Sequence, residues 1–176
     1  MKITIATLFI AAIMAAFLFE DEISRSLAPI RAATTLIGDP VVTDGDSLRL
    51  DGHRVRLRWV DACEIGQTAT RYGRQIDCGV WARGRLVDMV GARPVTCTVL
   101  GEDRYQRALA DCVSAVGEDL SLGLLRSGSA FLYDRGSAPA AHVRAAEAAE
   151  AARSGIHGFT SLATPRDYRE RRERSR

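Results

Sequence analysis

The chain has 176 residues and a formal net charge of +2 at pH 7, with 47% hydrophobic and 26% charged residues. This length predicts a single domain with a substantial core, and the composition is typical of a globular chain rather than a disordered one. The small net charge gives no indication, at the level of the whole molecule, of a nucleic-acid binder. Every basic residue except Lys2 is an arginine, so any phosphate contact would come from a planar guanidinium.

The N-terminus has the pattern of an export or anchoring segment. Lys2 precedes an apolar run over residues 3–19, and three acidic residues follow it. A basic start before such a run is typical of an export signal or a short membrane anchor, and the flanking charges favour a cytoplasmic N-terminus. We therefore predict an exported, periplasmic chain in which residues 1–19 are either a removed signal or an anchor in the inner membrane. A buried core helix is the alternative.

The segment after this run predicts a linker and then strands. Residues 20–37 have mixed charges and small residues, and they are predicted to form a linker. From residue 39 to 60 apolar and polar side chains alternate, and Asp51-Gly52 is a strong hairpin signal. The strand after this hairpin would carry Arg56 and Arg58 on the same polar face.

After residue 64 the sequence predicts a loop, three helices and two further strands. Residues 65–77 are polar and are predicted to form a loop, after which a helix can start at Asp77. Further elements are predicted as strands over residues 95–100 and 109–113, and as helices over 120–126 and 140–153. Strands followed mainly by helices predict an α+β fold in which helices cap a small barrel. Residues 164–176 contain six arginines and three acids and are predicted to be a mobile, basic tail.

Four cysteines are an even number in a chain predicted to be exported, which indicates two disulfides with three possible connectivities. The strands around residues 103–107 should be antiparallel neighbours, so Cys97 would face Cys112 across the ladder. Cys63 would then pair with Cys78. A zinc site is the alternative, but the chain lacks the C-x2-C and H-x3-H spacings of such sites.

Carboxylates and arginines gather in three short segments. The first is the Asp-Gly-Asp-Ser sequence at residues 44–47, the second runs from Arg56 to Glu64, and the third covers residues 103–107. Clustered carboxylates can hold a hard divalent cation, another carboxylate can accept a proton from water, and arginines can bind a phosphate. In this order, the three segments favour metal-assisted phosphodiester cleavage.

These segments resemble the motifs of the staphylococcal (micrococcal) nuclease family. Residues 44–47 match its D-G-D-[ST] pattern, Arg56 and residues 60–64 match an arginine followed by [IV]-D-[AT]-P-E, and residues 103–110 match D-[RK]-Y-G-R-x-L-A. Segments 124–130 and 148–156 are also similar to family segments. The resemblance implies a five-stranded OB-type barrel capped by about three helices, over residues 38–163.

The resemblance also implies a cation site. Asp46, Asp61 and the backbone carbonyl of Ala62 would be the ligands, with Asp44 beside them to orient waters. Such hard oxygen ligands favour Ca²⁺, with Mg²⁺ also possible. Glu64 would be the general base or would orient the attacking water.

The remaining family positions would contact the substrate. Arg56 and Arg107 would bind the phosphate and stabilise the transition state, and Arg104 and Tyr105 would lie in a substrate-facing turn. Arg58, which shares the strand face of Arg56, has no such counterpart in the family.

The chain departs from the family pattern at two positions. Cys63 stands where the family has proline, and a Cys63–Cys78 bridge would supply a comparable constraint beside Glu64. Gln106 replaces a glycine before Arg107, which costs about 1 kcal/mol or more if that turn needs positive φ.

The leading hypothesis is an exported Ca²⁺-dependent nuclease that acts on single-stranded or denatured DNA or RNA with little sequence preference, as a monomer without a protein partner. The departures at Cys63 and Gln106 motivate a second hypothesis, an OB module that binds a polyanion or an envelope partner. A third hypothesis is a role in exopolysaccharide production, because rhizobial succinoglycan-biosynthesis clusters contain a member of this family.

Overall fold

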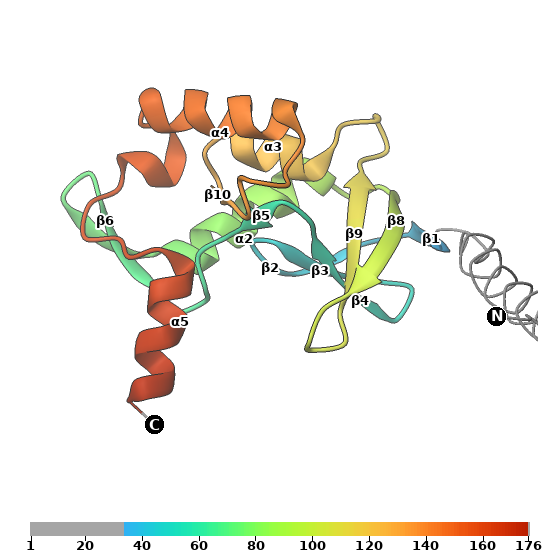
Figure 1. The fold of residues 1–176 in the computed structure, drawn as a ribbon, viewed down its shortest axis with the longest axis horizontal. Helices are drawn as coiled ribbons and strands as arrows, with labels where there is room; N and C mark the ends of the chain where they lie inside the picture. Colours follow the sequence, from blue (N-terminus) through green and yellow to red (C-terminus); the bar gives the residue numbers. More distant parts are fainter. Residues whose placement is uncertain (1–33, 176) are drawn as a thin grey trace, which may run out of the picture. The chain divides into compact units, whose positions relative to one another are not determined.

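A computed structural model describes residues 34–175 (Figure 1). The predicted signal or anchor at residues 1–19, and residues 20–33 of the predicted linker, lie outside the described residues. Within residues 34–175, none of the helices is both long enough and apolar enough to cross a membrane.

The main sheet has six strands in the order β1-β8-β9-β4-β3-β2 and curls into a half-barrel (Figure 1). Neighbouring strands are antiparallel except for β4 and β9, which run parallel. Its strands are β1 (Thr34–Gly38), β2 (Val41–Asp44), β3 (Ser47–Leu50), β4 (His53–Leu57), β8 (Val95–Glu102) and β9 (Ala108–Val113). Two small sheets pair β5 (Val60–Asp61) with β10 (Phe131–Leu132), and β6 (Thr68–Arg71) with β7 (Arg74–Asp77).

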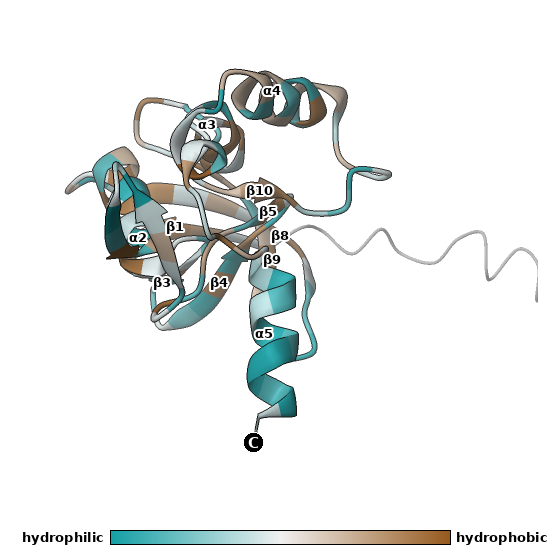
Figure 2. Ribbon diagram, turned by 90° about the vertical axis from the view of Figure 1, so that its left-hand side faces the viewer, coloured by the Kyte–Doolittle hydropathy of each residue, from teal (hydrophilic) through white to brown (hydrophobic). Residues whose placement is uncertain are grey.

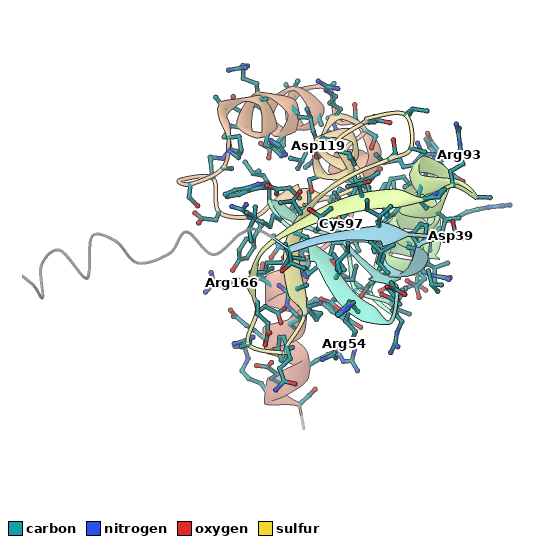
Figure 3. The ribbon with its side chains drawn as sticks, turned by 90° about the vertical axis from the view of Figure 1, so that its right-hand side faces the viewer. Asp39, Arg54, Arg93, Cys97, Asp119 and Arg166 are labelled. Atoms are coloured by element: carbon teal, nitrogen blue, oxygen red, sulfur yellow. A yellow bond between two sulfur atoms is a disulfide. The ribbon has the colours of Figure 1, made fainter. Side chains whose placement is uncertain are left out.

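Four helices and a 3-10 turn accompany the strands. They are α2 (Cys78–Val90), α3 (Leu120–Arg126), α4 (Ala140–Ala151), α5 (Pro165–Arg174) and η1 (Gly155–Gly158). Helices α3 and α4 lie together on one side of the sheet, and α5 projects from the opposite side (Figures 1 and 2). Figure 3 shows Asp119, at the start of α3, in this helical layer and Cys97 in the sheet. The predicted α+β fold is therefore confirmed.

The sheet has one strand more than the five expected, because the end of the predicted linker belongs to it. Residues 34–37 form most of β1, which pairs with β8 so that Leu36 lies opposite Cys97. Leu36 is half-buried against the core, whereas most of β1 is exposed. This weak apolar pattern explains why the sequence did not predict an edge strand here.

Turn residues with positive φ define two hairpins. Asp51 and Gly52, with φ of 48° and 79°, join β3 to β4, which confirms the predicted hairpin. Tyr72 and Gly73, with φ of 50° and 73°, join β6 to β7 in the same way. The prediction of a loop over residues 65–77 is therefore wrong. The polar composition of these strands hid the hairpin, although Tyr72-Gly73 supplied a two-residue turn.

The core lies between the curled sheet and helices α2, α3 and α4. Helix α2 begins at its N-cap Asp77, as predicted, and buries one face through Ala82, Leu86 and Val90. The largest core side chains come from strands and helices alike: Leu48, Leu50, Val55, Leu57, Leu86, Val95, Leu120, Leu124 and Leu125. This burial is the main source of stability for the fold.

Two disulfides join neighbouring elements, with the connectivity that the sequence predicted. Cys97 and Cys112 lie opposite each other on β8 and β9, with their Cα atoms 4.1 Å apart. Cys63 is bonded to Cys78, which links the segment after β5 to the first residue of α2. No free cysteine is present among the residues that the structure describes.

The C-terminal segment forms a helix, whereas the sequence predicted a mobile tail. Thr164 is the N-cap of α5 and accepts a hydrogen bond from the backbone of Asp167, and Pro165 occupies the first turn. The Arg166–Glu170 ion pair adds support along the exposed surface of the helix. These capping signals are present in the sequence, but its high charge made it resemble a tail.

Candidate active site

The predicted site residues converge where the β2–β3 turn meets the end of β4. The chain reverses after β4 at Trp59, whose φ is 68°, and this turn brings Asp61 back toward Arg56. Arg56 then bridges two carboxylates: its Nη1 lies 2.8 Å from Oδ2 of Asp46, and its Nη2 lies 3.0 Å from Oδ1 of Asp61. The structure thus joins residues that a straight strand would have kept on opposite faces.

Both bridged carboxylates are buried, with Asp46 4% and Asp61 6% exposed. Asp46 also accepts hydrogen bonds from the Ser47 hydroxyl at 2.8 Å and from the Ala62 amide at 3.3 Å. Burial alone would lower the pKa of Arg56, but the charges of Asp46 and Asp61 outweigh it and raise that pKa above its ordinary value. Arg56 therefore stays charged and holds the two carboxylates together.

Gly45 allows the Asp-Gly-Asp turn to lie close to the rest of the site. A Cβ atom at this position would lie 2.7 Å from the Cβ atoms of both Ala62 and Ala82. Side chains larger than hydrogen would therefore push the turn away from α2 and from the segment after β5. The backbone amide of Gly45 donates to Oδ1 of Asp44 at 2.9 Å, which fixes that carboxylate in the same turn.

Asp44 is a carboxylate with an unusually high pKa. Burial raises its pKa, the neighbouring charge of Asp46 raises it further, and the result is a pKa of about 6. The hydrogen bond from Gly45 lowers it only in part. The group is thus placed to exchange a proton near neutral pH, beside the predicted cation ligands.

The segment that carries Glu64 is fixed by several contacts. Besides the Cys63–Cys78 bridge, Gln67 is buried and its side-chain oxygen accepts from the Glu64 amide at 3.0 Å. The Glu64 backbone lies so close to α2 that a Cβ on Gly79 would be 2.2 Å from its carbonyl oxygen. The disulfide, Gln67 and Gly79 therefore constrain this segment, where the family pattern has a proline.

Arg169 of α5 is a site residue that the sequence reasoning missed. Its Nη1 and Nη2 lie 3.0 Å from Oδ1 and Oδ2 of Asp61, and Nη1 lies 2.6 Å from Oε1 of Glu64. Burial would lower the pKa of Arg169, but the hydrogen bonds that its guanidinium donates to Asp61 and Glu64 raise that pKa well above its ordinary value. The capping signals of α5 could have indicated that this arginine lies in a helix, but not that it contacts Asp61 and Glu64.

The third predicted segment forms a tight turn between β8 and β9. The Arg107 side chain pairs with Oδ2 of Asp103 through Nη2 at 2.6 Å and lies 3.3 Å from the Ser47 hydroxyl. Burial would raise the pKa of Asp103, but its hydrogen bonds with Arg107 and Tyr105 lower it overall. Gln106 has a φ of 60°, so the turn does require positive φ at the position where the family has glycine.

An open cavity of about 230 Å³ is lined by Asp44 and Ser47 of the Asp-Gly-Asp-Ser turn and by three arginines, Arg49, Arg54 and Arg107. Arg54 also donates to the Tyr105 carbonyl at 2.6 Å, which ties β4 to the turn before Arg107. Tyr105 is 50% exposed, and the Arg104 guanidinium stacks 4.8 Å from its ring centroid. Its exposed ring thus belongs to the same turn as Arg107, which lines the cavity.

Arg58 lies outside this arrangement. It pairs with Asp111 at 3.1 Å and stacks on Trp59 at 4.2 Å. β4 ends at Leu57, and Arg58 continues beside β9, where its backbone amide donates to the Ala110 carbonyl at 3.1 Å. Arg58 is therefore held by Asp111 of β9 rather than by the carboxylates of the site.

Any cation at this site would be held through oxygen donors. In the part of the chain that the structure describes, no three histidine, cysteine, aspartate or glutamate groups cluster closely enough to hold a metal ion. The protein would therefore contribute the two buried carboxylates of Asp46 and Asp61 and the Ala62 carbonyl, with water supplying further ligands. This mixed set of oxygens fits Ca²⁺ or Mg²⁺ better than zinc.

The fold and the site define a nuclease-like α+β domain. The family model described as "Staphylococcal nuclease homologue" matches residues 54–158, and the chain belongs to this family. The chain is 35% identical over 127 residues to "Succinoglycan biosynthesis protein ExoI" of Rhizobium meliloti (strain 1021), covering 71% of this chain and 63% of that protein. It is 30% identical over 98 residues to an "Uncharacterized endonuclease" of Escherichia coli O157:H7, covering 53% of this chain and 58% of that protein. The chain thus spans less than two thirds of the length of either relative.

Proposed function

We propose that the chain is a Ca²⁺-dependent nuclease that hydrolyses phosphodiester bonds of DNA or RNA with little sequence preference. The observation that carries this proposal is the convergence of three separate segments at one site. The two buried carboxylates of Asp46 and Asp61 share the Arg56 guanidinium. Glu64 pairs with Arg169, which also contacts Asp61. Arg107 lines the 230 Å³ cavity that Asp44 also lines. The family and the relative named as an endonuclease support the same reaction.

Each group has a role that follows from its chemistry. When bound, Ca²⁺ would polarise a phosphoryl oxygen and acidify a coordinated water. Glu64 accepts the proton of the attacking water, since it is the least buried of the clustered carboxylates that pair with arginine. Arg56 and Arg107 bind the phosphate oxygens and stabilise the additional negative charge of the transition state.

The substrate would be a single strand bound by stacking and phosphate contacts. Tyr105 offers an exposed ring, and Arg104 and the cavity arginines offer positive charge next to it. Stacking on an aromatic side chain accepts any base, so this surface predicts low sequence preference. Denatured DNA and RNA are therefore the substrates to test first.

We also propose that the protein is exported and acts as a monomer in the periplasm, with residues 3–19 as a signal or as an inner-membrane anchor. Two disulfides support export, because such bonds persist in oxidising compartments. The similarity to a succinoglycan biosynthesis protein favours a second candidate role, in which the same domain serves exopolysaccharide production.

The test is digestion of denatured DNA and RNA by the purified chain, with Ca²⁺ or with a chelator. We expect strand cleavage that requires the cation and is lost in Asp46→Ala, since Asp46 would be a cation ligand. Binding of nucleic acid without cleavage would instead support a non-catalytic OB module. Cleavage that persists in chelator would contradict the proposed cofactor.

A further inference from the structure

We propose that α5 is an autoinhibitory element whose Arg169 occupies the cation site and must withdraw before Ca²⁺ binds. This inference rests on the cation site proposed above. It concerns the regulation of that site rather than the reaction itself.

The guanidinium of Arg169 takes the place that a cation would need. It contacts both carboxylate oxygens of Asp61 at 3.0 Å, while Oδ1 of Asp61 also accepts from Arg56 at 3.0 Å. The same guanidinium contacts Glu64 at 2.6 Å. A predicted cation ligand and the predicted general base are thus both neutralised by one side chain of the C-terminal helix.

Arg169 and Ca²⁺ are therefore expected to exclude each other. A divalent cation on Asp61 would need the oxygen lone pairs that Arg169 now uses, and it would repel the guanidinium beside it. While the Arg169 guanidinium donates to Oε1 of Glu64 at 2.6 Å, it occupies the side of that carboxylate where an attacking water would have to bind. Release of α5 would free both carboxylates at once.

The helix is built so that release costs little. Of the ten residues of α5 only Pro165 is buried, and the helix is strongly hydrophilic along its length (Figure 2). A groove of about 670 Å³ lies between α5 and β6, so the helix is not closely packed there. The Arg169 side chain is therefore the main polar connection between the body of α5 and the site.

The segment before α5 is held by hydrogen bonds, so α5 could move away from the site while its N-terminal end stays in place. Thr160 pairs with Thr70 of β6 through two backbone hydrogen bonds of 2.8 and 3.0 Å. The side-chain nitrogen of buried Gln67 donates to the Ala163 carbonyl at 2.7 Å. Gln67 also holds the Glu64 amide, so the anchor of α5 and the site segment share one residue.

The experiment is calorimetric titration of the full-length chain with Ca²⁺ alone, comparing Arg169→Ala with the unmodified protein. Arg166→Ala is the matched control, because Arg166 lies on the same helix with an 81% exposed side chain paired to Glu170. We expect Arg169→Ala to tighten Ca²⁺ binding by about 5-fold or more, as is typical of coupled sites, and Arg166→Ala to leave it unchanged.

A second readout separates displacement from simple removal of charge. By linkage, Ca²⁺ should weaken the docking of α5 by the same factor, so hydrogen exchange of the amides of residues 168–174 should accelerate when Ca²⁺ is added. The Asp46→Ala variant, which should not bind Ca²⁺, should show no such acceleration.

The outcomes are distinguishable. Equal Ca²⁺ affinity in Arg169→Ala and the unmodified chain would overturn autoinhibition and leave the proposed nuclease intact. Weaker binding in Arg169→Ala, or tighter binding with unchanged exchange of α5, would also overturn it. If neither protein bound Ca²⁺, the cation site and the inference built on it would both fail.

Discussion

The two disulfides allow stability and site geometry to be tested separately. Each joins cysteines 15 residues apart, so the chain-entropy model predicts about 3 kcal/mol of stabilisation from each. Cys97–Cys112 links strands that are already paired, whereas Cys63–Cys78 fixes the residue before Glu64. We therefore expect similar losses of stability but different losses of activity.

The variants are Cys63→Ala/Cys78→Ala and Cys97→Ala/Cys112→Ala, since all four sites are fully buried and alanine leaves no polar group there. Urea unfolding followed by circular dichroism should show a loss of about 3 kcal/mol in both. At low urea, turnover should fall only in the first variant, by up to about 100-fold, because a shift of about an ångström in Glu64 has that effect. Equal turnover in the two variants would refute the positioning role of Cys63–Cys78.

Three further predictions test single residues. The raised pKa of Asp44 means that its contribution to stability is largest below about pH 4 and is lost as the pH rises through about 6 in metal-free buffer. Asp44→Asn should therefore stabilise the protein above pH 6 by on the order of 1 kcal/mol after solvent screening. Urea titrations should show no such gain at pH 4. Arg56→Ala should lower turnover on denatured DNA by about 100-fold or more. Arg58→Ala should lower turnover far less, because Arg58 pairs with Asp111. Equal losses of turnover in the two variants would indicate a diffuse basic surface. Gln106→Gly should raise the free energy of unfolding by about 0.5–1 kcal/mol, because its φ of 60° is costly for a residue with a side chain, and an unchanged value would mean that the turn relaxes.

Much of the fold could be predicted because local pattern and tertiary structure agree there. The hairpin at Asp51-Gly52, the start of α2 at Asp77 and the helix over residues 120–126 each carry turn or capping chemistry in a few adjacent residues. The Cys97–Cys112 pair followed from antiparallel pairing around a short turn. Such features depend on few long-range contacts, so the sequence indicates them directly.

The sequence failed where a segment depends on distant partners. Strand β1 owes its structure to the edge of β8, and the β6–β7 hairpin has polar strands. At the site, the motifs predicted that Arg56, Asp46 and Asp61 come together, but the turn at Trp59 that does so has no sequence signal, because non-glycine residues seldom take positive φ. Arg169 is 108 residues from Asp61 in the chain, and nothing in its local sequence indicates that contact.

The most direct test of the proposed chemistry is the turnover of Glu64→Gln on a single-stranded DNA substrate at saturating Ca²⁺. Glutamine keeps the size of the side chain but cannot accept the proton of the attacking water. We predict a loss of turnover of about 100-fold or more, with an unchanged urea unfolding midpoint and unchanged DNA binding. Turnover equal to that of the unmodified chain would contradict the assigned mechanism, even if the protein proved to be a nuclease.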